Sequence, residues 1–257
     1  MAAQTVGLLH PGEMGSAVGA CLTAGGTRVL WASAGRSDES AQRAAEAGLE
    51  DVGSAEDVAA QADVVLSICP PHAALELARS LPSFQGIYVD ANAVAPETVR
   101  EIGESFDRFV DGGIVGGPPR AAEVTHLYLS GPHAATVADV FAGTPVEARI
   151  VSDEVGDASA VKMAYAAWTK GSAALLLAVR ELADRAGVDG ALAAEWEESI
   201  PGLAARRERA RVSAERKGWR WVGEMDEIAK TFAAHGLPDG FHRAAAEVFG
   251  WRQGVRS

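Results

Sequence analysis

The clearest chemical signature in the sequence is formed by His10, Pro11, Gly12 and Gly15, which lie between a short apolar run and a helix-like stretch. In a dinucleotide-binding turn of the pattern Gly-x-Gly-x-x-Gly, the second glycine lets the backbone approach the pyrophosphate and the third lets the helix pack on the strand. Gly12 and Gly15 occupy these positions, but His10 replaces the first glycine, so His10 or Pro11 must turn the chain. Backbone N–H groups at a helix start can still bind phosphate. The predicted cofactor-binding residues of this turn are His10, Pro11, Gly12 and Glu13, and the alternative is an ordinary strand-to-helix turn.

The segment after the second apolar run indicates which dinucleotide is preferred. A carboxylate about 20 residues beyond the turn would bind the ribose 2′-hydroxyl and favour NAD. Here the segment Ser33-Ala-Gly-Arg-Ser37 has no carboxylate, and the first one is Asp38. Ser33, Arg36 and Ser37 are instead suited to bind a 2′-phosphate, which favours NADP over NAD. In the alternative interpretation Arg36 is a solvated loop residue.

Short apolar runs alternate with helix-like stretches through the first part of the chain. This alternation is typical of βαβ units and a mostly parallel sheet, and the runs are rich in Val, Ile and Leu, as strands buried on both faces are. Strands are predicted at residues 6–9, 28–31, 63–68, 86–90, 109–111 and 126–129, and helices at residues 15–24 and 41–47. We therefore expect residues 1–155 to form a Rossmann-type, doubly wound α/β domain.

The sequence changes character in its second part. Residues 157–185 contain no proline and one glycine, and their apolar residues recur at helical spacing, which predicts one helix about 40 Å long. Further helices are predicted at residues 190–199, 204–217, 225–234 and 241–250. Residues 156–257 are therefore expected to form an all-α C-terminal domain. Because the long helix outreaches a small domain, we expect it to offer a surface to a second subunit in a homodimer.

Composition excludes several classes of protein. The 257 residues carry 35 acidic and 23 basic side chains, and the net charge of −12 argues against nucleic acid as a partner. No apolar run approaches the roughly 18 to 20 residues of a membrane-spanning helix, and the first residues lack the basic stretch of a secretion signal, so a cytoplasmic location is expected. The two cysteines are too few for a disulfide framework, and His72, His126 and His133 show no metal-binding spacing, so no metal is expected.

Five motifs follow one another along the chain: Gly12-Glu-Met-Gly15, Ile68-Cys-Pro-Pro71, Asp90-Ala-Asn-Ala-Val-Ala-Pro96, Asp111-Gly-Gly-Ile-Val-Gly-Gly117 and Gly156-Asp-Ala-Ser-Ala-Val-Lys162. In this order and spacing they resemble the β-hydroxyacid dehydrogenases, which include 3-hydroxyisobutyrate dehydrogenase and 6-phosphogluconate dehydrogenase. The resemblance spans about residues 5–185. The remaining chain is similar to a branch of the family with a short helical C-terminal domain.

The resemblance implies roles for particular residues. The implied cofactor-binding residues are Met14, Cys69, Pro70 and Asn92. Residues 111–117 match the segment that binds the substrate's carboxylate through backbone amides, and the implied substrate-binding residues within it are Val115, Gly116 and Gly117. Lys162 matches the family's catalytic lysine. When hydride leaves a carbinol carbon, the hydroxyl proton must pass to a base that returns it in the reverse reaction. A lysine can serve when burial and nearby positive charge lower its pKa from about 10.4 toward about 7 or 8.

Three polar substrate contacts of the family are altered in this sequence. The asparagine four residues after the lysine is Ala166, a serine of the glycine-rich segment is Val115, and a lysine of the last helices falls on Gly223. We therefore expect a more apolar site, suited to a bulkier or less polar carbonyl, alcohol or imine. The candidate substitute donors are Tyr165, Thr169, Lys170 and His242, of which Tyr165 is also a candidate catalytic residue. In the alternative interpretation Tyr165 is a core residue and His242 a helix-start residue.

The sequence thus predicts an NADP-dependent oxidoreductase that transfers a hydride to or from a hydroxyl or carbonyl carbon of a small organic substrate, with Lys162 as general acid and base. The site is expected outside the carboxyl ends of the strands, in a cleft between the two domains. Two alternatives remain open, because a fold does not fix a function. One is an imine reductase, in which Tyr165 or Lys162 assists protonation, and the other is a non-catalytic nucleotide-binding sensor. Whether His242 or Trp221 completes a neighbouring subunit's site is also left open.

Overall fold

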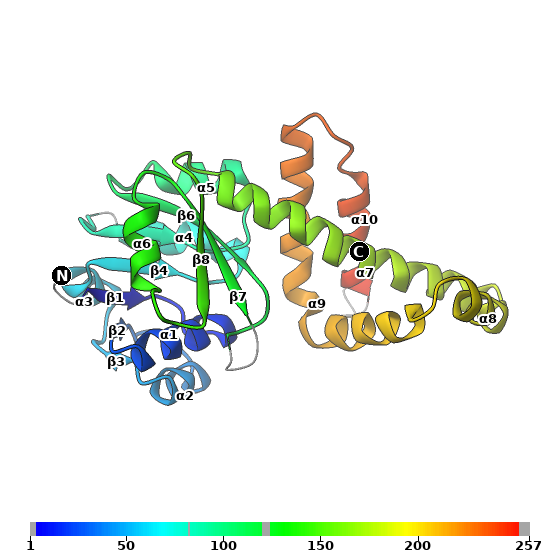
Figure 1. The fold of residues 1–257 in the computed structure, drawn as a ribbon, viewed down its shortest axis with the longest axis horizontal. Helices are drawn as coiled ribbons and strands as arrows, with labels where there is room; N and C mark the ends of the chain where they lie inside the picture. The colour runs from blue at the N-terminus through cyan, green and yellow to red at the C-terminus, as the bar shows by residue number, and fades with distance from the viewer. Residues whose placement is uncertain (1–3, 82, 120–123, 252–257) are drawn as a thin grey trace. The chain divides into compact units, whose positions relative to one another are not determined.

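The computed structural model describes residues 4–81, 83–119 and 124–251, and it divides the chain into two compact units, Met1–Lys162 and Met163–Ser257 (Figure 1). Each unit is described by itself. The boundary between the units falls after Lys162, within a helix, whereas the sequence places the domain boundary after residue 155. Among the described residues, no helix combines the length and the apolar character that a membrane span requires.

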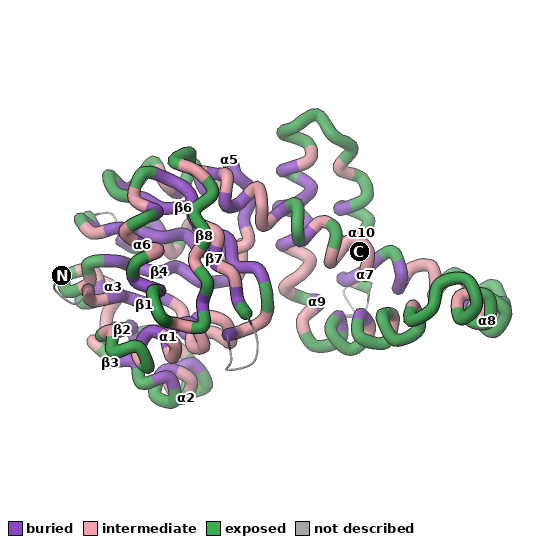
Figure 2. Tube along the Cα trace, viewed as in Figure 1, coloured by how far each residue is buried: buried purple, intermediate pink, exposed green. Residues whose placement is uncertain are grey.

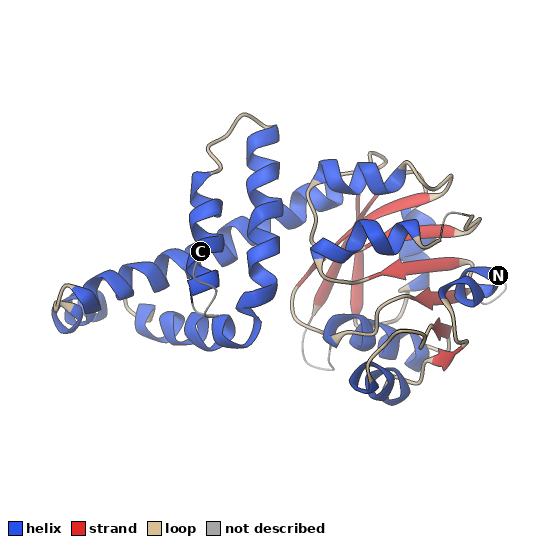
Figure 3. Cartoon of the chain, turned by 180° about the vertical axis from the view of Figure 1, so that it is seen from behind, coloured by secondary structure: helices blue, strands red, loops and turns tan. Residues whose placement is uncertain are grey.

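The first unit is built on an eight-stranded sheet with the order β3-β2-β1-β4-β5-β6-β7-β8. Figure 3 shows the strands in red and the helices in blue. Its strands are β1 (Thr5–Leu8), β2 (Arg28–Trp31), β3 (Glu50–Asp51), β4 (Val64–Ser67), β5 (Ile87–Asp90), β6 (Phe109–Val115), β7 (Thr125–Ser130) and β8 (Val146–Ser152). All neighbouring pairs are parallel except β6 and β7. This is the doubly wound sheet expected from the sequence, with the strand predicted at residues 126–129 present as β7 and with two strands that were not predicted, β3 and β8.

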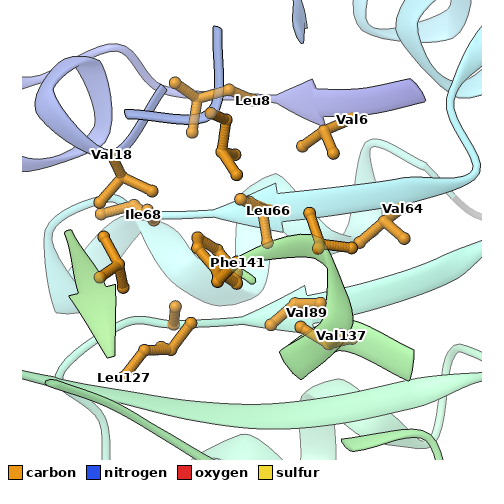
Figure 4. Close-up of a cluster of buried hydrophobic side chains, with 14 of the residues drawn as sticks. Val6, Leu8, Val18, Val64, Leu66, Ile68, Val89, Leu127, Val137 and Phe141 are labelled. Atoms are coloured by element: carbon orange, nitrogen blue, oxygen red, sulfur yellow. The ribbon is translucent and has the colours of Figure 1, made fainter. Parts of the chain in front are cut away.

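Helices cover both faces of this sheet. They are α1 (Glu13–Ala24), α2 (Asp38–Glu46), α3 (Ala55–Gln61), α4 (Ala74–Arg79), α5 (Pro96–Gly103) and α6 (Ala134–Val140), with a 3₁₀ turn at Pro71–Ala73. One buried apolar cluster joins the strands to α1, α2 and α6 (Figure 4), and a second joins them to α3, α4 and α5. All residues of β4 and β5 are buried (Figure 2), and burial on both faces explains why Val64–Leu66 and Ile87–Val89 are apolar without alternation.

The second unit contains most of α7 (Asp157–Arg185) together with α8 (Asp189–Ser199), α9 (Leu203–Ala234) and α10 (Gly240–Trp251). The predicted long helix at residues 157–185 is confirmed. The predicted separation of helices 204–217 and 225–234 is wrong, because α9 runs through Gly218 and Gly223 without a break. Both glycines keep helical hydrogen bonding, and the buried face continues through Met225 and Ile228, so tertiary packing outweighs the weak helix preference of glycine.

Candidate active site

The carboxyl ends of β1, β4, β5 and β6 lie at one edge of the sheet, because these four strands are mutually parallel. The loops that follow them carry most of the residues predicted from the sequence: the glycine-rich turn after β1, Cys69 and Pro70 after β4, Asn92 after β5, and Gly116 and Gly117 after β6. Ligands of open α/β sheets bind at this edge. The fold of the first unit therefore brings these predicted residues to one place.

The glycine-rich turn is held by tight backbone packing. Gly12 is the N-cap of α1 and donates its N–H to the carbonyl of His10 over 2.9 Å. His10 needs no left-handed conformation, since no described residue other than glycine has a positive φ. A Cβ on Gly15 would lie 2.3 Å from the His10 carbonyl oxygen, which shows how closely the helix approaches the turn. The missing first glycine is thus compatible with the turn, and the N-terminal amides of α1 remain suited to a phosphate.

Two arginines hold the turn from the loop and helix after β2. Arg36 donates from Nη2 to the Leu9 carbonyl over 2.9 Å, and Arg43 donates from Nε to the Pro11 carbonyl over 3.1 Å. Arg36 therefore lies beside the glycine-rich turn rather than in open solvent. The Arg43 contact was not predicted from the sequence, and the available signal was its position seven residues beyond Arg36, in the helix that follows the segment Ser33–Ser37.

The two predicted serines of this region have structural partners. Ser37 is the N-cap of α2, and its hydroxyl accepts from the Ser40 N–H over 3.3 Å. The Ser33 N–H donates to Asp51 Oδ1 over 3.2 Å, and hydrogen bonds from Gly53 and Ser33 lower the pKa of Asp51. These contacts fix the backbone of residues 33–37 next to Arg36.

Asn92 braces the ends of two strands. Its Oδ1 accepts from the Cys69 N–H over 2.5 Å, and its Nδ2 donates to Ser67 Oγ over 2.9 Å and to Asp90 Oδ2 over 2.8 Å. The residue is 2% exposed. Both amide hydrogens of Asn92 are thus used within the protein. Asn92 therefore acts on this edge of the sheet by fixing the loop at Cys69, and not by donating a hydrogen bond from its side chain to a ligand.

Burial controls the ionisation of two groups in this network. It raises the pKa of the Cys69 thiol to about 12, so this cysteine stays protonated near neutral pH and is not a reactive thiolate. Burial also raises the pKa of Asp90 to about 7, against the opposing effect of its hydrogen bonds from Asn92. The ionised form of Asp90 is therefore costly in the folded protein.

We expect the unfolding free energy contributed by Asp90 to fall as the pH rises. Because the folded pKa lies above the unfolded value of about 3.9, the contribution is fully present below pH 4 and is lost as the pH passes through about 7. The difference in protonation free energy is on the order of 4 kcal/mol. Urea denaturation of wild type and Asp90→Asn at pH 5, 6.5 and 8 measures this difference. The unfolding free energy of the wild type, relative to that of Asp90→Asn, should fall as the pH increases. Parallel pH dependences of the two proteins would contradict this assignment.

Lys162 lies against the end of β6. Its Nζ donates to the Ile114 carbonyl over 2.7 Å, and a Cβ on Gly113 would lie 3.0 Å from the Lys162 Cβ. Gly116, which follows the strand, has a φ of 118° that side-chain-bearing residues rarely adopt. The predicted proton-transfer group and the predicted substrate-binding glycines are therefore brought together within the first unit.

The predicted substrate segment is mostly strand. Val115 is the last residue of β6 and is buried, whereas Gly116 is exposed and Gly117 is half-buried. The Gly117 carbonyl accepts from Thr125 Oγ1 over 2.7 Å, which fixes the backbone after the strand. Gly116 and Gly117 thus belong to the loop that follows the strand, whereas residues 111–115 belong to the strand itself.

The remaining predicted residues belong to the second unit. Tyr165 is 48% exposed, and Thr169 donates its hydroxyl to the Tyr165 carbonyl over 3.1 Å. His242 is 7% exposed and packs against Phe232 with ring centroids 4.3 Å apart. Burial lowers the pKa of His242, and its Nδ1 has no hydrogen-bond partner among the described residues. His242 is near the start of α10, so its position agrees with the helix-start interpretation, while Tyr165 is not a core residue.

Lys170 makes a largely buried ion pair with Glu224, 2.6 Å from Nζ to Oε2, and lies 5.9 Å from the ring centroid of Trp221. Trp221 in turn contacts Phe249 edge to face, with centroids 5.0 Å apart. These contacts join α7, α9 and α10. Lys170 and Trp221 therefore have structural partners within the helical unit.

No cluster of three or more His, Cys, Asp or Glu side chains suited to a metal ion occurs within residues 4–81, 83–119 and 124–251. The arrangement at the sheet edge offers instead a phosphate-binding turn, two arginines, a loop braced by Asn92 and one amine. Such groups suit a nucleotide cofactor and a proton-transfer reaction.

Comparisons with known proteins agree with this architecture. Residues 5–94 match the family described as NADP oxidoreductase coenzyme F420-dependent, and residues 183–251 match the domain of unknown function DUF1932. An uncharacterized 28.5 kDa protein of Methanothermus fervidus is 33% identical over 159 residues, which are 60% of this chain and 61% of that protein. The alignment thus spans less than two thirds of the relative's length.

Solved structures match over nearly the whole chain. A conserved protein of unknown function, described as structurally similar to 3-hydroxyacid dehydrogenases, is 27% identical with a TM-score of 0.71 and 97% of each chain covered. A conserved hypothetical protein from Sinorhizobium meliloti 1021 is 28% identical with a TM-score of 0.69, covering 96% of this chain and 88% of that one. The 3-hydroxyisobutyrate dehydrogenase of Mycobacterium tuberculosis, at 17% identity and a TM-score of 0.70, covers 98% and 94% and shares the fold.

The fold is therefore that of the 3-hydroxyacid dehydrogenases, with a Rossmann-type α/β unit followed by a helical region. The predicted resemblance to the β-hydroxyacid dehydrogenases is confirmed.

Proposed function

We propose that this protein is an NADP-dependent oxidoreductase that transfers a hydride to or from a hydroxyl or carbonyl carbon of a small organic substrate. The observation that carries the proposal is the Lys162 amine, 2.7 Å from the Ile114 carbonyl at the edge of the sheet where the glycine-rich turn also lies. This amine is the group proposed to take the proton from a substrate hydroxyl and to return it in the reverse reaction.

The residues at the sheet edge fit a nicotinamide dinucleotide. A Cβ on Gly15 would lie 2.3 Å from the His10 carbonyl oxygen, so that position has no room for a side chain, and the α1 N-terminus can bind a pyrophosphate. Arg36 and Arg43 add positive charge beside the turn, where a 2′-phosphate would favour NADP. Among the proteins that share the fold, a reductive aminase from Aspergillus terreus has been solved with NADPH at 17% identity, and another protein with NADP⁺ at 21%.

When bound, the nicotinamide would supply or accept the hydride. The chain's own residues then bind the phosphates of the dinucleotide. The amides of residues 116–117 orient the carboxylate or the carbonyl group of the substrate, and Lys162 holds a proton on Nζ. Val115 and Ala166 are both buried and apolar, at positions where the related family has polar contacts. This supports a substrate less polar than a small hydroxylated or phosphorylated acid.

Assembly and location are also part of the proposal. Trp168, Leu175 and Leu182 follow one another at seven-residue spacing on α7 and are each 60% to 68% exposed. A stripe of this kind is suited to a helix of a second copy, which supports a homodimer. We propose a homodimer in the cytoplasm acting on a small molecule.

The proposed function is tested by cofactor binding and turnover. Fluorescence titration should give a lower Kd for NADPH than for NADH, and a spectrophotometric screen of NADPH oxidation against keto acids, aldehydes and cyclic imines should find a substrate. Turnover of cyclic imines alone would replace the proposal with an imine reductase. Tight NADPH binding without turnover of any class would replace it with a nucleotide-binding sensor.

Replacing Arg36 by alanine is expected to weaken NADPH binding about 10- to 100-fold more than NADH binding, since NADH loses only the support that Arg36 gives to the Leu9 carbonyl of the turn. A charge-assisted hydrogen bond to a phosphate is worth about 1.5 to 3 kcal/mol, and NADH has no 2′-phosphate. Arg43→Ala should weaken both dinucleotides, because Arg43 holds the Pro11 carbonyl of the turn. Arg79→Ala, an exposed arginine paired with Glu101, is the matched control. Equal losses for NADPH and NADH in Arg36→Ala would show that Arg36 does not read the 2′-phosphate.

A further inference from the structure

Strand β6 presents one buried carboxylate to the start of α7. Asp111 has no solvent exposure, and its side chain accepts four hydrogen bonds. Oδ2 accepts from Ser130 Oγ (3.0 Å), the Gly156 N–H (3.0 Å) and the Ser159 N–H (2.9 Å), and Oδ1 accepts from Ser159 Oγ (2.7 Å). A carboxylate has about four acceptor sites, and the four donors at Asp111, three at Oδ2 and one at Oδ1, all belong to the protein. Its side chain is thus committed to the protein and not to a ligand.

These bonds cap the start of α7 from another element. The first N–H groups of a helix have no partner within the helix, and a side-chain oxygen usually satisfies them. Here the acceptor is carried by a strand, and Ser130 Oγ adds a further bond by accepting from the Ala158 N–H over 3.0 Å. A negative charge is also favourable at a helix N-terminus. The first turn of α7 is therefore fixed to the sheet through Asp111 and its partner Ser130.

The same strand fixes the helix at two further points. A Cβ on Gly113 would lie 2.7 Å from the Ala158 carbonyl oxygen, so the helix rests directly on the strand backbone. One helical turn beyond Ser159, Lys162 donates from Nζ to the Ile114 carbonyl over 2.7 Å. Asp111 thus holds the start of the helix, Gly113 contacts its side, and Ile114 binds Lys162.

We propose that Asp111 is the positioning residue for Lys162: by capping α7, its carboxylate sets the height and rotation of the helix at which the amine reaches the Ile114 carbonyl beside Gly116. The family resemblance alone places Asp111 in a substrate-binding segment, but its bonds direct it to the helix. This inference rests on the proposed function for its catalytic consequence, whereas the positioning itself is independent of any substrate.

The test measures how fast the Lys162 amine is acetylated in the protein without cofactor or substrate. Wild type, Asp111→Asn and Ser159→Ala are treated with a limiting amount of acetic anhydride, and acetylation of each lysine is followed by mass spectrometry. Loss of the carboxylate should release the amine, so Lys162 should react about tenfold faster in Asp111→Asn and a few-fold faster in Ser159→Ala, which loses only the bond from Ser159 Oγ. Lys230, whose side chain is 60% exposed, is the internal reference and should not change.

A second measurement separates positioning from general loosening. Asp90→Asn alters another fully buried aspartate, which is paired in register with Asp111 on the neighbouring strand, and it should leave Lys162 acetylation at the wild-type rate.

For the enzyme with its substrate, kcat of Asp111→Asn should fall about tenfold or more, with the KM for NADPH within about twofold and the pKa of the kcat profile displaced.

Unchanged Lys162 acetylation in folded Asp111→Asn would overturn the inference, as would equal acceleration at Lys162 and Lys230. If Asp111→Asn does not fold, Ser159→Ala decides by the same criterion. Selective exposure of Lys162 in a protein without turnover would uphold the positioning and reject the proposed function. If the wild type turns over a substrate and the variants show unchanged Lys162 acetylation, the proposed function is upheld and the positioning role of Asp111 is rejected.

Discussion

Lys162→Ala is expected to lower kcat by about 10²- to 10⁴-fold while the Kd for NADPH stays within about twofold. A positioned acid or base contributes a factor of this size to proton transfer, and alanine has no group that can exchange the proton. The phosphate-binding turn follows β1, whereas Lys162 lies against the end of β6, so the dinucleotide should still bind. Steady-state kinetics with the substrate found in the screen, together with fluorescence titration of NADPH, measure the two effects separately.

Two further variants sharpen this prediction. Lys162→Arg keeps a positive charge, but a guanidinium stays protonated at all accessible pH values and cannot act as a base, so it should be nearly as slow as Lys162→Ala. Lys230→Ala removes an exposed lysine from α9 and should leave kcat unchanged. Turnover that survives in Lys162→Ala would remove the lysine from the mechanism and leave Tyr165 as the candidate acid.

The course of the chain could be predicted where burial leaves a regular pattern in the sequence. α7 was predicted at residues 157–185 because no proline interrupts it and its apolar residues keep helical spacing. Strands β4 and β5 were predicted because both faces are buried. By contrast, β8 was missed because this edge strand is largely exposed and contains Glu147 and Arg149, so it has no continuous apolar run. The break predicted in α9 failed because glycine is a weak signal inside a packed helix.

The candidate site could be predicted as a set of loops but not as a set of contacts. Gly12 and Gly15 were found because close approach of the backbone demands glycine, whereas Gly116 came from the family resemblance and its positive φ from the structure. The contacts of Arg43 with Pro11 and of Asp111 with Ser159 join residues 32 and 48 positions apart, and a single sequence does not record such pairs. The family resemblance implied that Asn92 binds the cofactor, whereas its hydrogen bonds show what its side chain holds.

Gly15→Ala is expected to lower the unfolding free energy by about 1 to 3 kcal/mol and to weaken NADPH binding at least about tenfold. The added Cβ would lie 2.3 Å from the His10 carbonyl oxygen, which is backbone and cannot move aside as the end of a side chain can. Overpacking of a tight contact costs about this much, and the turn must separate from α1 to relieve it. The amides that bind the pyrophosphate would then be displaced. Urea denaturation and fluorescence titration of NADPH measure the two effects.

Two other glycines provide matched controls for this coupling. A Cβ on Gly12 would meet only the His10 ring, at 3.1 Å and 3.2 Å, so Gly12→Ala should keep nearly wild-type stability. The variant should lose NADPH affinity, because the added methyl group lies where the backbone approaches the phosphate. Gly223 has nothing within 4 Å of an added Cβ and lies inside α9, so Gly223→Ala should raise stability by about 0.5 to 1 kcal/mol and leave NADPH binding unchanged. If Gly15→Ala behaved like Gly223→Ala, the close approach of α1 to the turn would have no part in binding the dinucleotide. If Gly12→Ala bound NADPH as the wild type does, the phosphate would have to lie elsewhere along the sheet edge.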